Sequence, residues 1–536
     1  MNKFRYPVDT DQFQKIREQG KLYIDKTDII YDLVNKYEYV FLARPRRFGK
    51  SLLCNTLKAY FQGQKELFED LKIMQLEKEW KKHPVLHFTM SGLKDCSVPM
   101  AQSKLEGFIR DYEEIYGRKE SDKSPGARFR TLIHNAVAQT GERAVVIFDE
   151  YDAPIMRLLY DPQLNDMRSL LREFYQVLKD EGAYLRFVFI TGVTKFSQMS
   201  IFSELNNLMQ ISMLDEYSGL CGITKHELDT VMRPCVEEYA KTLEVTIDDA
   251  YNILRKNYDG YRFSSKSQDI YAPFSLLRAL NDNSSNHYWF ESGTSISLIE
   301  HIKRFPKFNP LDYDDIEVSL SDFNAPCEYA STPIPLLYQS GYLSIREYDK
   351  EVDAYILHFP NHEVRYGLLD CLTNYLMETE NLERNATIIN MARSLIRGDL
   401  SSALITMRSW IASLPYDIIT QKEWMEKKDR EYFYKLLMYI IFSLLNSKVD
   451  TEVKSILGRA DVVIQTKNDI YVIELKVDKP VDNALSQIND KGYAIPYHAD
   501  ERRLTKCGVQ ISSDKRNIVH WKWVDKDGNT IDEQKF

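Results

Sequence analysis

One segment constrains the fold of this chain more than any other: an apolar run at residues 39–43, a loop, and a helix-forming run from residue 52. Strand, loop and helix in this order form the context of a phosphate-binding loop. The loop reads Arg44-Pro45-Arg46-Arg47-Phe48-Gly49-Lys50-Ser51. Backbone N–H groups at the start of a helix bind phosphate, and the helix dipole favours the negative charge. The segment therefore predicts an α/β fold with an anion site at this helix.

The loop also supplies side chains suited to bound ATP. Lys50 would reach the β- and γ-phosphates, and the Ser51 hydroxyl would ligate Mg²⁺. The predicted nucleotide contacts are Arg46, Arg47, Phe48, Gly49, Lys50, Ser51 and, from a later strand, Asp149. Arg44 stands where the usual G-x-x-x-x-G-K-S pattern has its first glycine. Either the loop is rearranged, or nucleotide binding is weak, or the match is accidental or a structural relic.

A second motif supports the nucleotide site. The apolar run at 144–148 ends in Asp149 and Glu150, which is the arrangement of a Walker B strand. Asp149 would hold Mg²⁺ through its water shell. Glu150 would act as the catalytic general base on the attacking water. The next strand ends near Thr191 and Thr194, which are either sensors of the γ-phosphate or residues of an ordinary strand-end turn.

The first 225 residues alternate apolar, strand-like runs with longer helical segments. The expected strands are 38–43, 85–89, 144–148 and 187–191. Continuous apolar runs suit a parallel sheet that is covered on both faces. Helices between such strands predict an α/β domain.

This N-terminal part resembles the AAA-ATPase-like family found beside bacterial nuclease domains. The matching segments are Tyr23-Ile24-Asp25-Lys26-Thr27, residues 44–51, Phe148-Asp149-Glu150-Tyr151-Asp152 and residues 190–197. The resemblance covers residues 4 to 225 and implies ATP binding by an ASCE-type P-loop core, in which Arg44 is typical. Asp25 and Thr27 are assigned no role beyond capping a local helix.

Arg46 and Arg47 add positive charge beside the phosphate site. They would neutralise the γ-phosphate, as arginine fingers do in trans, or form a solvated basic turn. The first role leaves open a homo-oligomer in which these arginines act across a subunit boundary.

The sequence pattern changes near residue 226, where helical segments begin to dominate. Thr224 and Glu227 form a capping-box pattern. A helix ending at Gly341 and strands at 343–346 and 354–359 suggest a winged-helix-like module, which would contact DNA or serve as a lid. The expected division is 1–225 (P-loop domain), 226–375 (helical lid and winged-helix-like region), 376–424 (helical connector) and 425–536 (C-terminal α/β domain).

The C-terminal part contains an acidic hairpin. If the strands fold symmetrically about Lys467 and Asn468, Asp461 faces Glu474. Cross-strand neighbours have Cβ atoms about 5 Å apart, so both carboxylates can share one ion. Glu474 and Lys476 are two residues apart and point to the same face. Mg²⁺ prefers carboxylate oxygens, and bound Mg²⁺ activates water towards a phosphodiester. The alternative is an exposed hairpin with a surface Glu–Lys pair.

These residues resemble the PD-(D/E)XK nuclease superfamily. The matches are Gly458-Arg459-Ala460-Asp461, Ile473-Glu474-Leu475-Lys476, residues 484–488 and residues 491–494. The resemblance covers 425 to 536 and implies metal on Asp461 and Glu474, with Lys476 as the catalytic lysine. Ala460 replaces the proline of the superfamily name, a mild departure. Further candidates are Glu452 or Glu431 as an extra ligand, and Gln487 with Lys491 on one helix face. The alternative for each of them is a surface residue.

Composition limits the partners. The formal net charge of −9 means that any nucleic-acid contact comes from a local patch. Seven widely spaced cysteines form no C-x-x-C pair, so neither a zinc site nor a disulfide framework is expected. The N-terminus has no apolar signal region, and the longest apolar run, at 436–445, is too short for a bilayer. We therefore expect a cytoplasmic protein with no membrane partner.

Two interpretations follow. In the first, the chain is an ATP-binding, ATP-hydrolysing enzyme with a Mg²⁺-dependent nuclease domain that acts on nucleic acid, specifically DNA. In the second, it is an ATP-controlled binding or signalling module whose nuclease-like domain recognises nucleic acid without cleaving it. The retained set of Asp461, Glu474 and Lys476 favours the first.

Overall fold

The chain forms two compact units, Met1–Phe308 with Asp312–Arg365 and Asn309–Leu311 with Tyr366–Phe536. The computed structural model describes residues 4–156, 158–159, 161–194, 207–292, 298, 301–302, 304–305, 308, 310–327, 330–377, 381–413, 434, 437, 440–441, 452–454 and 461–536. The finer division into four parts stays a prediction.

A five-stranded parallel sheet organises the first unit. Its strands are β1 (Tyr39–Ala43), β2 (Val85–Thr89), β3 (Ala144–Asp149), β4 (Leu185–Gly192) and β5 (Met209–Gln210), in the order β2-β3-β4-β1-β5. The four predicted strands are confirmed to within two residues at each end, whereas the two-residue β5 was not foreseen. Because the strands are parallel, the loop after β1 and the acids that end β3 lie at the same edge of the sheet.

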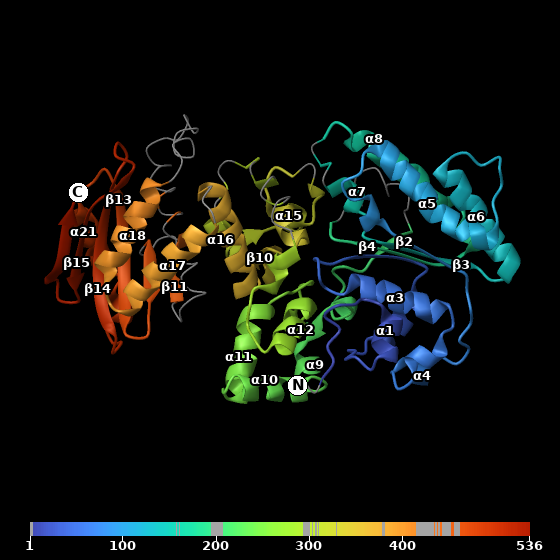
Figure 1. The fold of residues 1–536 in the computed structure, drawn as a ribbon, viewed down its shortest axis with the longest axis horizontal. Helices are drawn as coiled ribbons and strands as arrows, with labels where there is room; N and C mark the ends of the chain where they lie inside the picture. The colour runs from blue at the N-terminus through green and yellow to red at the C-terminus, as the bar shows by residue number, and fades with distance from the viewer. Residues whose placement is uncertain are drawn as a thin grey trace. The chain divides into compact units, whose positions relative to one another are not determined.

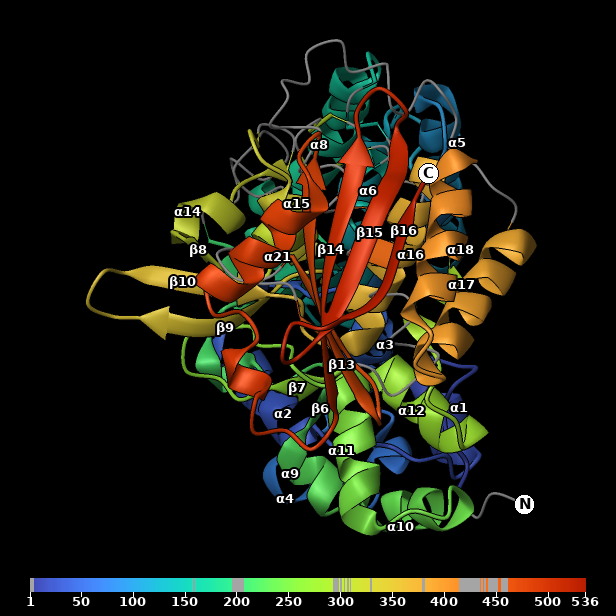
Figure 2. The same ribbon diagram turned by 90° about the vertical axis from the view of Figure 1, so that its left-hand side faces the viewer.

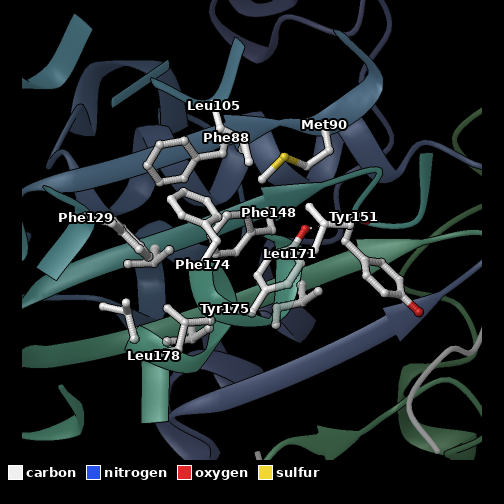
Figure 3. Packing of buried hydrophobic residues seen from close by; sticks show 14 of the residues in the cluster. Phe88, Met90, Leu105, Phe129, Phe148, Tyr151, Leu171, Phe174, Tyr175 and Leu178 are labelled. Atoms are coloured by element: carbon white, nitrogen blue, oxygen red, sulfur yellow. Dashed lines mark hydrogen bonds between the residues drawn. The ribbon is translucent and has the colours of Figure 1, made fainter. Parts of the chain in front are cut away.

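Helices cover both faces of this sheet (Figure 1). One face carries α1 (Phe13–Glu18), α2 (Thr27–Lys36), α3 (Lys50–Phe61) and α4 (Ile73–Leu76). The other carries α5 (Val98–Tyr116), α6 (Pro125–Thr140), α7 (Ala153–Met156) and α8 (Leu164–Asp180). Figure 3 shows the core on this second side, where the Phe88 and Phe148 rings stack with centroids 5.2 Å apart. Burial of β1 and β3 on both faces explains their continuous apolar runs.

The rest of the first unit is mainly helical. It contains β6 (Ile223–Thr224), α9 (Lys225–Asp229), α10 (Arg233–Thr242), α11 (Ile247–Tyr258), β7 (Ile270–Tyr271) and α12 (Pro273–Asp282). The predicted capping box at Thr224 and Glu227 is confirmed. An antiparallel sheet of order β8-β10-β9 follows, built from β8 (Ile316–Val318), β9 (Ser344–Asp349) and β10 (Ala354–His358), with α14 (Leu320–Phe323) and α15 (Ile334–Gln339) between β8 and β9. The predicted helix and hairpin are therefore present.

The second unit is built on a mixed six-stranded sheet. Its strands are β11 (Glu452–Lys454), β12 (Val462–Gln465), β13 (Asp469–Val477), β14 (Arg503–Ser512), β15 (Asn517–Asp525) and β16 (Thr530–Lys535), in sequential order. Only the β13–β14 pair is parallel among the described strands of this sheet, because α21 (Val481–Asp490) crosses between them.

Helices again cover both faces of this second sheet (Figure 2). On one face, α21 packs on β13 and β14. On the other lie α17 (Asn381–Ile396) and α18 (Leu400–Ala412), which follow α16 (His362–Met377). Arg408 of α18 donates to the carbonyl of Ile518 at 3.0 Å. The predicted connector thus packs on the sheet that follows it. The helix predicted from 425 to 446 falls largely outside the described residues, among which no helix is both long and apolar enough to cross a bilayer.

Candidate functional site

The phosphate loop joins β1 to α3 through two residues in left-handed backbone conformation. Arg47 has φ 67° and Gly49 has φ 86°. Such residues turn successive N–H groups towards one point, which makes an anion-binding concavity. The Lys50 ammonium donates to the carbonyls of Arg44 at 3.0 Å and Pro45 at 2.9 Å. Burial lowers the pKa of Lys50. The lysine therefore folds back across the loop.

Arg44, which replaces the usual glycine, is a structural residue. Its side chain is 1% exposed and points into the protein. The guanidinium donates to the carbonyls of Ala43 at 2.9 Å, Ser212 at 2.7 Å and Tyr217 at 3.1 Å. It also lies over the Phe263 ring, 4.1 Å from the centroid. The arginine thus ties the end of β1 to the segment after β5, and its backbone carbonyl remains available to Lys50.

Arg44→Gly should lower the free energy of unfolding of the first unit by about 3 kcal/mol, because charge-assisted hydrogen bonds contribute about 1.5–3 kcal/mol. Hydrogen exchange of peptides from β1 and α3 measures this unit separately from the other. Arg118→Gly, at an exposed position, is the control and should change little. Unchanged protection in Arg44→Gly would show that the arginine only substitutes for a glycine.

Phe48 and Pro45 hold the other side of the loop against the helical region. The Phe48 side chain is 1% exposed. Its ring centroid lies 4.7 Å from that of Tyr261 and 5.4 Å from that of Phe263. We call Tyr261 and Phe263 the aromatic socket. A Cβ added at Gly341 would lie 2.6 Å from the Pro45 Cβ, so only glycine lets the two backbones approach. The Phe48 ring lies in the socket, and the predicted contact of this residue with nucleotide stays a prediction.

The Walker B acids lie beside the loop. Asp149 is 2% exposed, and burial raises its pKa, against a hydrogen bond from Ser51 that lowers it. Its Oδ1 atom is buried without a hydrogen-bond partner in the described part of the chain. Glu150 has φ 52°, and burial, followed by the charge of Asp149, raises its pKa. A buried carboxylate with a free oxygen fits a divalent cation, and Glu150 suits a general base.

An open cleft of about 740 Å³ lies in front of the loop. Its lining includes Lys50, Ser51, Glu150 and a group of basic side chains, namely Lys15, Arg46, Arg47 and Lys94. Arg47 lies over the Phe274 ring, 4.3 Å from its centroid. The predicted basic turn therefore faces this cleft. Lys15 and Lys94 were missed, because they come from separate segments and no motif marks them.

The two threonines proposed as sensors have internal partners. The Thr191 hydroxyl donates to the carbonyl of Leu42 at 2.7 Å. The Thr194 hydroxyl donates to Asp152 Oδ2 at 2.7 Å, and the same oxygen accepts the N–H groups of Val193 and Thr194. These contacts favour the interpretation that both threonines belong to an ordinary strand-end turn. Asp152 positions the turn that follows β4.

The Asp25-Lys26-Thr27 segment anchors neighbouring elements. Asp25 Oδ1 accepts the N–H of Thr27 at 2.9 Å, and Thr27 accepts the N–H of Ile73 at 3.1 Å. Lys26 pairs with Glu227 at 2.5 Å, both largely buried. The segment therefore has a structural role, beyond the helix cap that its sequence predicts.

The acidic hairpin has the predicted register. Val462 pairs with Ile473, so Asp461 comes opposite Glu474. Asp461 Oδ2 accepts the N–H of Leu475 at 2.8 Å, and Glu474 Oε2 accepts the N–H of Asp461 at 3.3 Å. Lys476 donates to Glu474 Oε1 at 2.9 Å, which confirms that both side chains lie on one face. Glu474 is fully buried and Lys476 is 8% exposed.

Comparison with known proteins gives the family. A family model described as "Predicted AAA-ATPase" matches residues 7–202, and one described as "PD-(D/E)XK nuclease superfamily" matches residues 429–521. A relative from Azotobacter chroococcum mcd 1, described as an uncharacterized protein in the vnfD 5′ region, is 32% identical over 531 residues. The alignment covers 97% of this chain and 98% of that protein. The chain belongs to this family of AAA-ATPase-like proteins with a C-terminal PD-(D/E)XK domain.

The AAA-ATPase-like match includes the phosphate loop and both Walker B acids but ends before the aromatic socket. The PD-(D/E)XK match includes Asp461, Glu474 and Lys476. Each predicted motif therefore falls inside the family model that its resemblance implied. Both matches are to domain families, so they support ATPase-like and nuclease-like activity at the family level only.

The structure describes only some of the further residues predicted for the PD-(D/E)XK site. Glu431 lies outside the described residues, and so does the side chain of Glu452, although its backbone belongs to β11. Gln487 donates to the Tyr493 hydroxyl at 3.3 Å, and Lys491 is exposed at the end of α21. Gly508 pairs with Glu474, and a Cβ there would lie 2.7 Å from the carbonyl of Val481. This glycine lets α21 approach the strand beside the acidic hairpin.

Proposed function

We propose that this protein hydrolyses ATP at the AAA-ATPase-like site and cleaves phosphodiester bonds in DNA at the PD-(D/E)XK site, with Mg²⁺ at both. The observation that carries the proposal is the convergence of Asp461, Glu474 and Lys476 on facing strands. A dead recognition domain has no need of two paired acids and a buried lysine in this register. Lys50, Asp149 and Glu150 support the ATPase part in the same way.

The residues of the ATPase site have separate roles in phosphate binding, metal binding and proton transfer. The N–H groups that begin α3 bind the phosphates, and Lys50 exchanges its two loop carbonyls for phosphate oxygens. Ser51 and Asp149 would hold Mg²⁺, because Asp149 Oδ1 has no hydrogen-bond partner among the described residues and Ser51 donates to the same carboxylate. Glu150 accepts a proton from the water that attacks the γ-phosphate, a role suited to its raised pKa. Arg46 and Arg47 neutralise charge on the outer phosphates.

In the nuclease domain, Asp461 and Glu474 on facing strands would hold the cation. Bound Mg²⁺ supplies a more acidic water and stabilises charge on phosphate oxygens. Hydrogen bonds from Leu475 and Asp461 N–H groups fix both carboxylates, so neither has to reorganise. Lys476, held 2.9 Å from Glu474, orients the attacking water or donates to the phosphate. The result is hydrolysis of one P–O bond, with the leaving oxygen protonated by solvent.

We also place the protein in the cytoplasm. Its seven cysteines, all among the described residues, are free thiols, which suits the reducing cytoplasm. The nucleic acid is contacted locally, because the net charge of −9 disfavours general adhesion to DNA.

The test is Mg²⁺-dependent cleavage by the full chain of supercoiled plasmid, linear single-stranded DNA and RNA, each with and without ATP. We expect plasmid cleavage with Mg²⁺, none after chelation, and a rate that changes with ATP. Cleavage of RNA alone would correct the substrate. Binding of DNA without any cleavage, under broad conditions, would establish the rival function of an ATP-controlled recognition module.

A further inference from the structure

Three side chains with different metal-binding chemistry meet beneath the phosphate loop. They are Cys54 of α3, His87 of β2 and Asp149 of β3, and their ligand atoms all lie within 4.8 Å of one another. The register explains the meeting of the last two. Thr89 pairs with Asp149 and His87 with Ile147, so His87 and Asp149 project from the same face of neighbouring strands. Helix α3 packs on both strands and brings Cys54 to this face.

In two of these side chains, one buried atom has no hydrogen-bond partner among the described residues. His87 Nε2 and Asp149 Oδ1 are both buried without a hydrogen-bond partner. Cys54 is fully buried and Asp149 is 2% exposed. A buried polar atom without a partner loses its hydration and gains no hydrogen bond in return, which is unfavourable. Two such atoms facing one thiol therefore point to a shared ligand rather than to ordinary packing.

We propose that Cys54, His87 and Asp149 form a binding site for a borderline-soft divalent cation, with Zn²⁺ as the best match. Thiolate and imidazole ligands select such ions, whereas Mg²⁺ prefers oxygen. Ligand atoms around tetrahedral zinc lie roughly 3.3–3.8 Å apart, given its bond lengths of about 2.0–2.3 Å. Side-chain shifts of about 1 Å close the present spacing. The Cys54 thiol proton leaves to solvent as the metal–sulfur bond forms.

The protonation state of His87 and some of the nearby charges favour a bound cation at this site. Burial lowers the pKa of His87 to about 4, so its ring is neutral at pH 7 and keeps a lone pair for a metal. The charge of Asp11 acts on all three groups and favours a cation. The charge of Lys50 acts against a cation at Cys54 and Asp149, and that of Lys58 does so at His87. Three protein ligands leave a fourth position open, as in catalytic or regulatory zinc sites rather than structural ones.

A consequence for the ATPase rests on the proposed function. Asp149 belongs to both sites, so a zinc ion on Oδ1 would withdraw this carboxylate from Mg²⁺. Zinc should therefore inhibit ATP hydrolysis, and Cys54→Ser should relieve the inhibition. If the protein proved not to hydrolyse ATP, this consequence would fall while metal binding would still be measurable.

Metal binding is tested with Co²⁺ on the chelator-treated full chain. Cobalt bound to a thiolate gives a near-ultraviolet charge-transfer band, which carboxylate sites such as the acidic hairpin do not give. We expect one equivalent of Co²⁺ to produce the band, Zn²⁺ to abolish it and Cys54→Ser to remove it. Cys221→Ser is the matched control, since Cys221 is a second buried thiol behind the loop, and should keep the band.

His87→Gln provides an independent variant, because this side chain is only partly buried and glutamine is of similar size. It should weaken Co²⁺ binding by about tenfold or more, since even loss of an outer-shell partner costs 10–100-fold. His83→Gln, just before β2, should not weaken it. A wild-type chain without the band, a band that survives Cys54→Ser, or unchanged affinity in His87→Gln would overturn the proposal. Circular dichroism verifies folding, and if Cys54→Ser does not fold, His87→Gln decides.

Discussion

Lys50→Ala should lower the rate of ATP hydrolysis by about 100- to 1000-fold, the usual loss when one preorganised charge on the transition state is removed. Lys50 bridges two carbonyls of the loop and, with ATP present, can turn to the phosphates. No other lysine of α3 lies in the cleft. The measurement is phosphate release by the full chain at saturating ATP and Mg²⁺, with ATP affinity from titration calorimetry.

Lys58→Ala is the matched control for this experiment. It lies two turns further along α3, is partly exposed and does not line the cleft. Its hydrolysis rate should stay within about twofold of wild type. Equal rates in Lys50→Ala and wild type would show that hydrolysis occurs elsewhere, whereas absence of ATP binding by wild type would identify the loop as a structural relic.

Asp461→Asn should lower DNA cleavage by about 100-fold or more, because a metal ion contributes several kcal/mol of charge stabilisation and asparagine binds it poorly. Asparagine keeps an acceptor for the Leu475 N–H, so the hairpin stays folded and only the charge is lost. Glu474→Gln should have a similar effect on cleavage. It would also leave the buried Lys476 ammonium without its anion, so Asp461→Asn is the cleaner variant.

The control is Asp482→Asn, the same substitution on α21, where the carboxylate is 72% exposed. It should cleave plasmid at the wild-type rate. Raising Mg²⁺ should partly restore Asp461→Asn if the defect is in metal binding. Full activity of Asp461→Asn at low Mg²⁺ would contradict the assigned role of this residue.

The sequence predicts best what depends on local pattern. The buried strands of the first sheet appear as unbroken apolar runs, so β2 was located to the residue. In the acidic hairpin, the turn at Lys467 and Asn468 sets the register, and the register then determines which carboxylates meet. Both results need only nearby residues and the period of a strand.

Contacts between distant segments were not predictable in this way. Arg44 looked like a defect in the loop, yet its partners Ser212 and Phe263 lie more than 160 residues further on. The spacing of the cysteines argued against a zinc site, because a motif search requires ligands close in sequence. Cys54 and His87 come together only through the packing of α3 on β2. The sequence alone has no signal for that packing.

The aromatic socket limits how short a recombinant fragment can be if it is to keep the phosphate loop intact. A fragment ending at residue 202 or 225 would keep every residue of the ATP motifs but would lose Tyr261 and Phe263. The Phe48 ring, now 1% exposed, would then face water inside the phosphate loop itself. Recombinant fragments that are meant to retain nucleotide binding should therefore extend through Arg365, where the first unit ends.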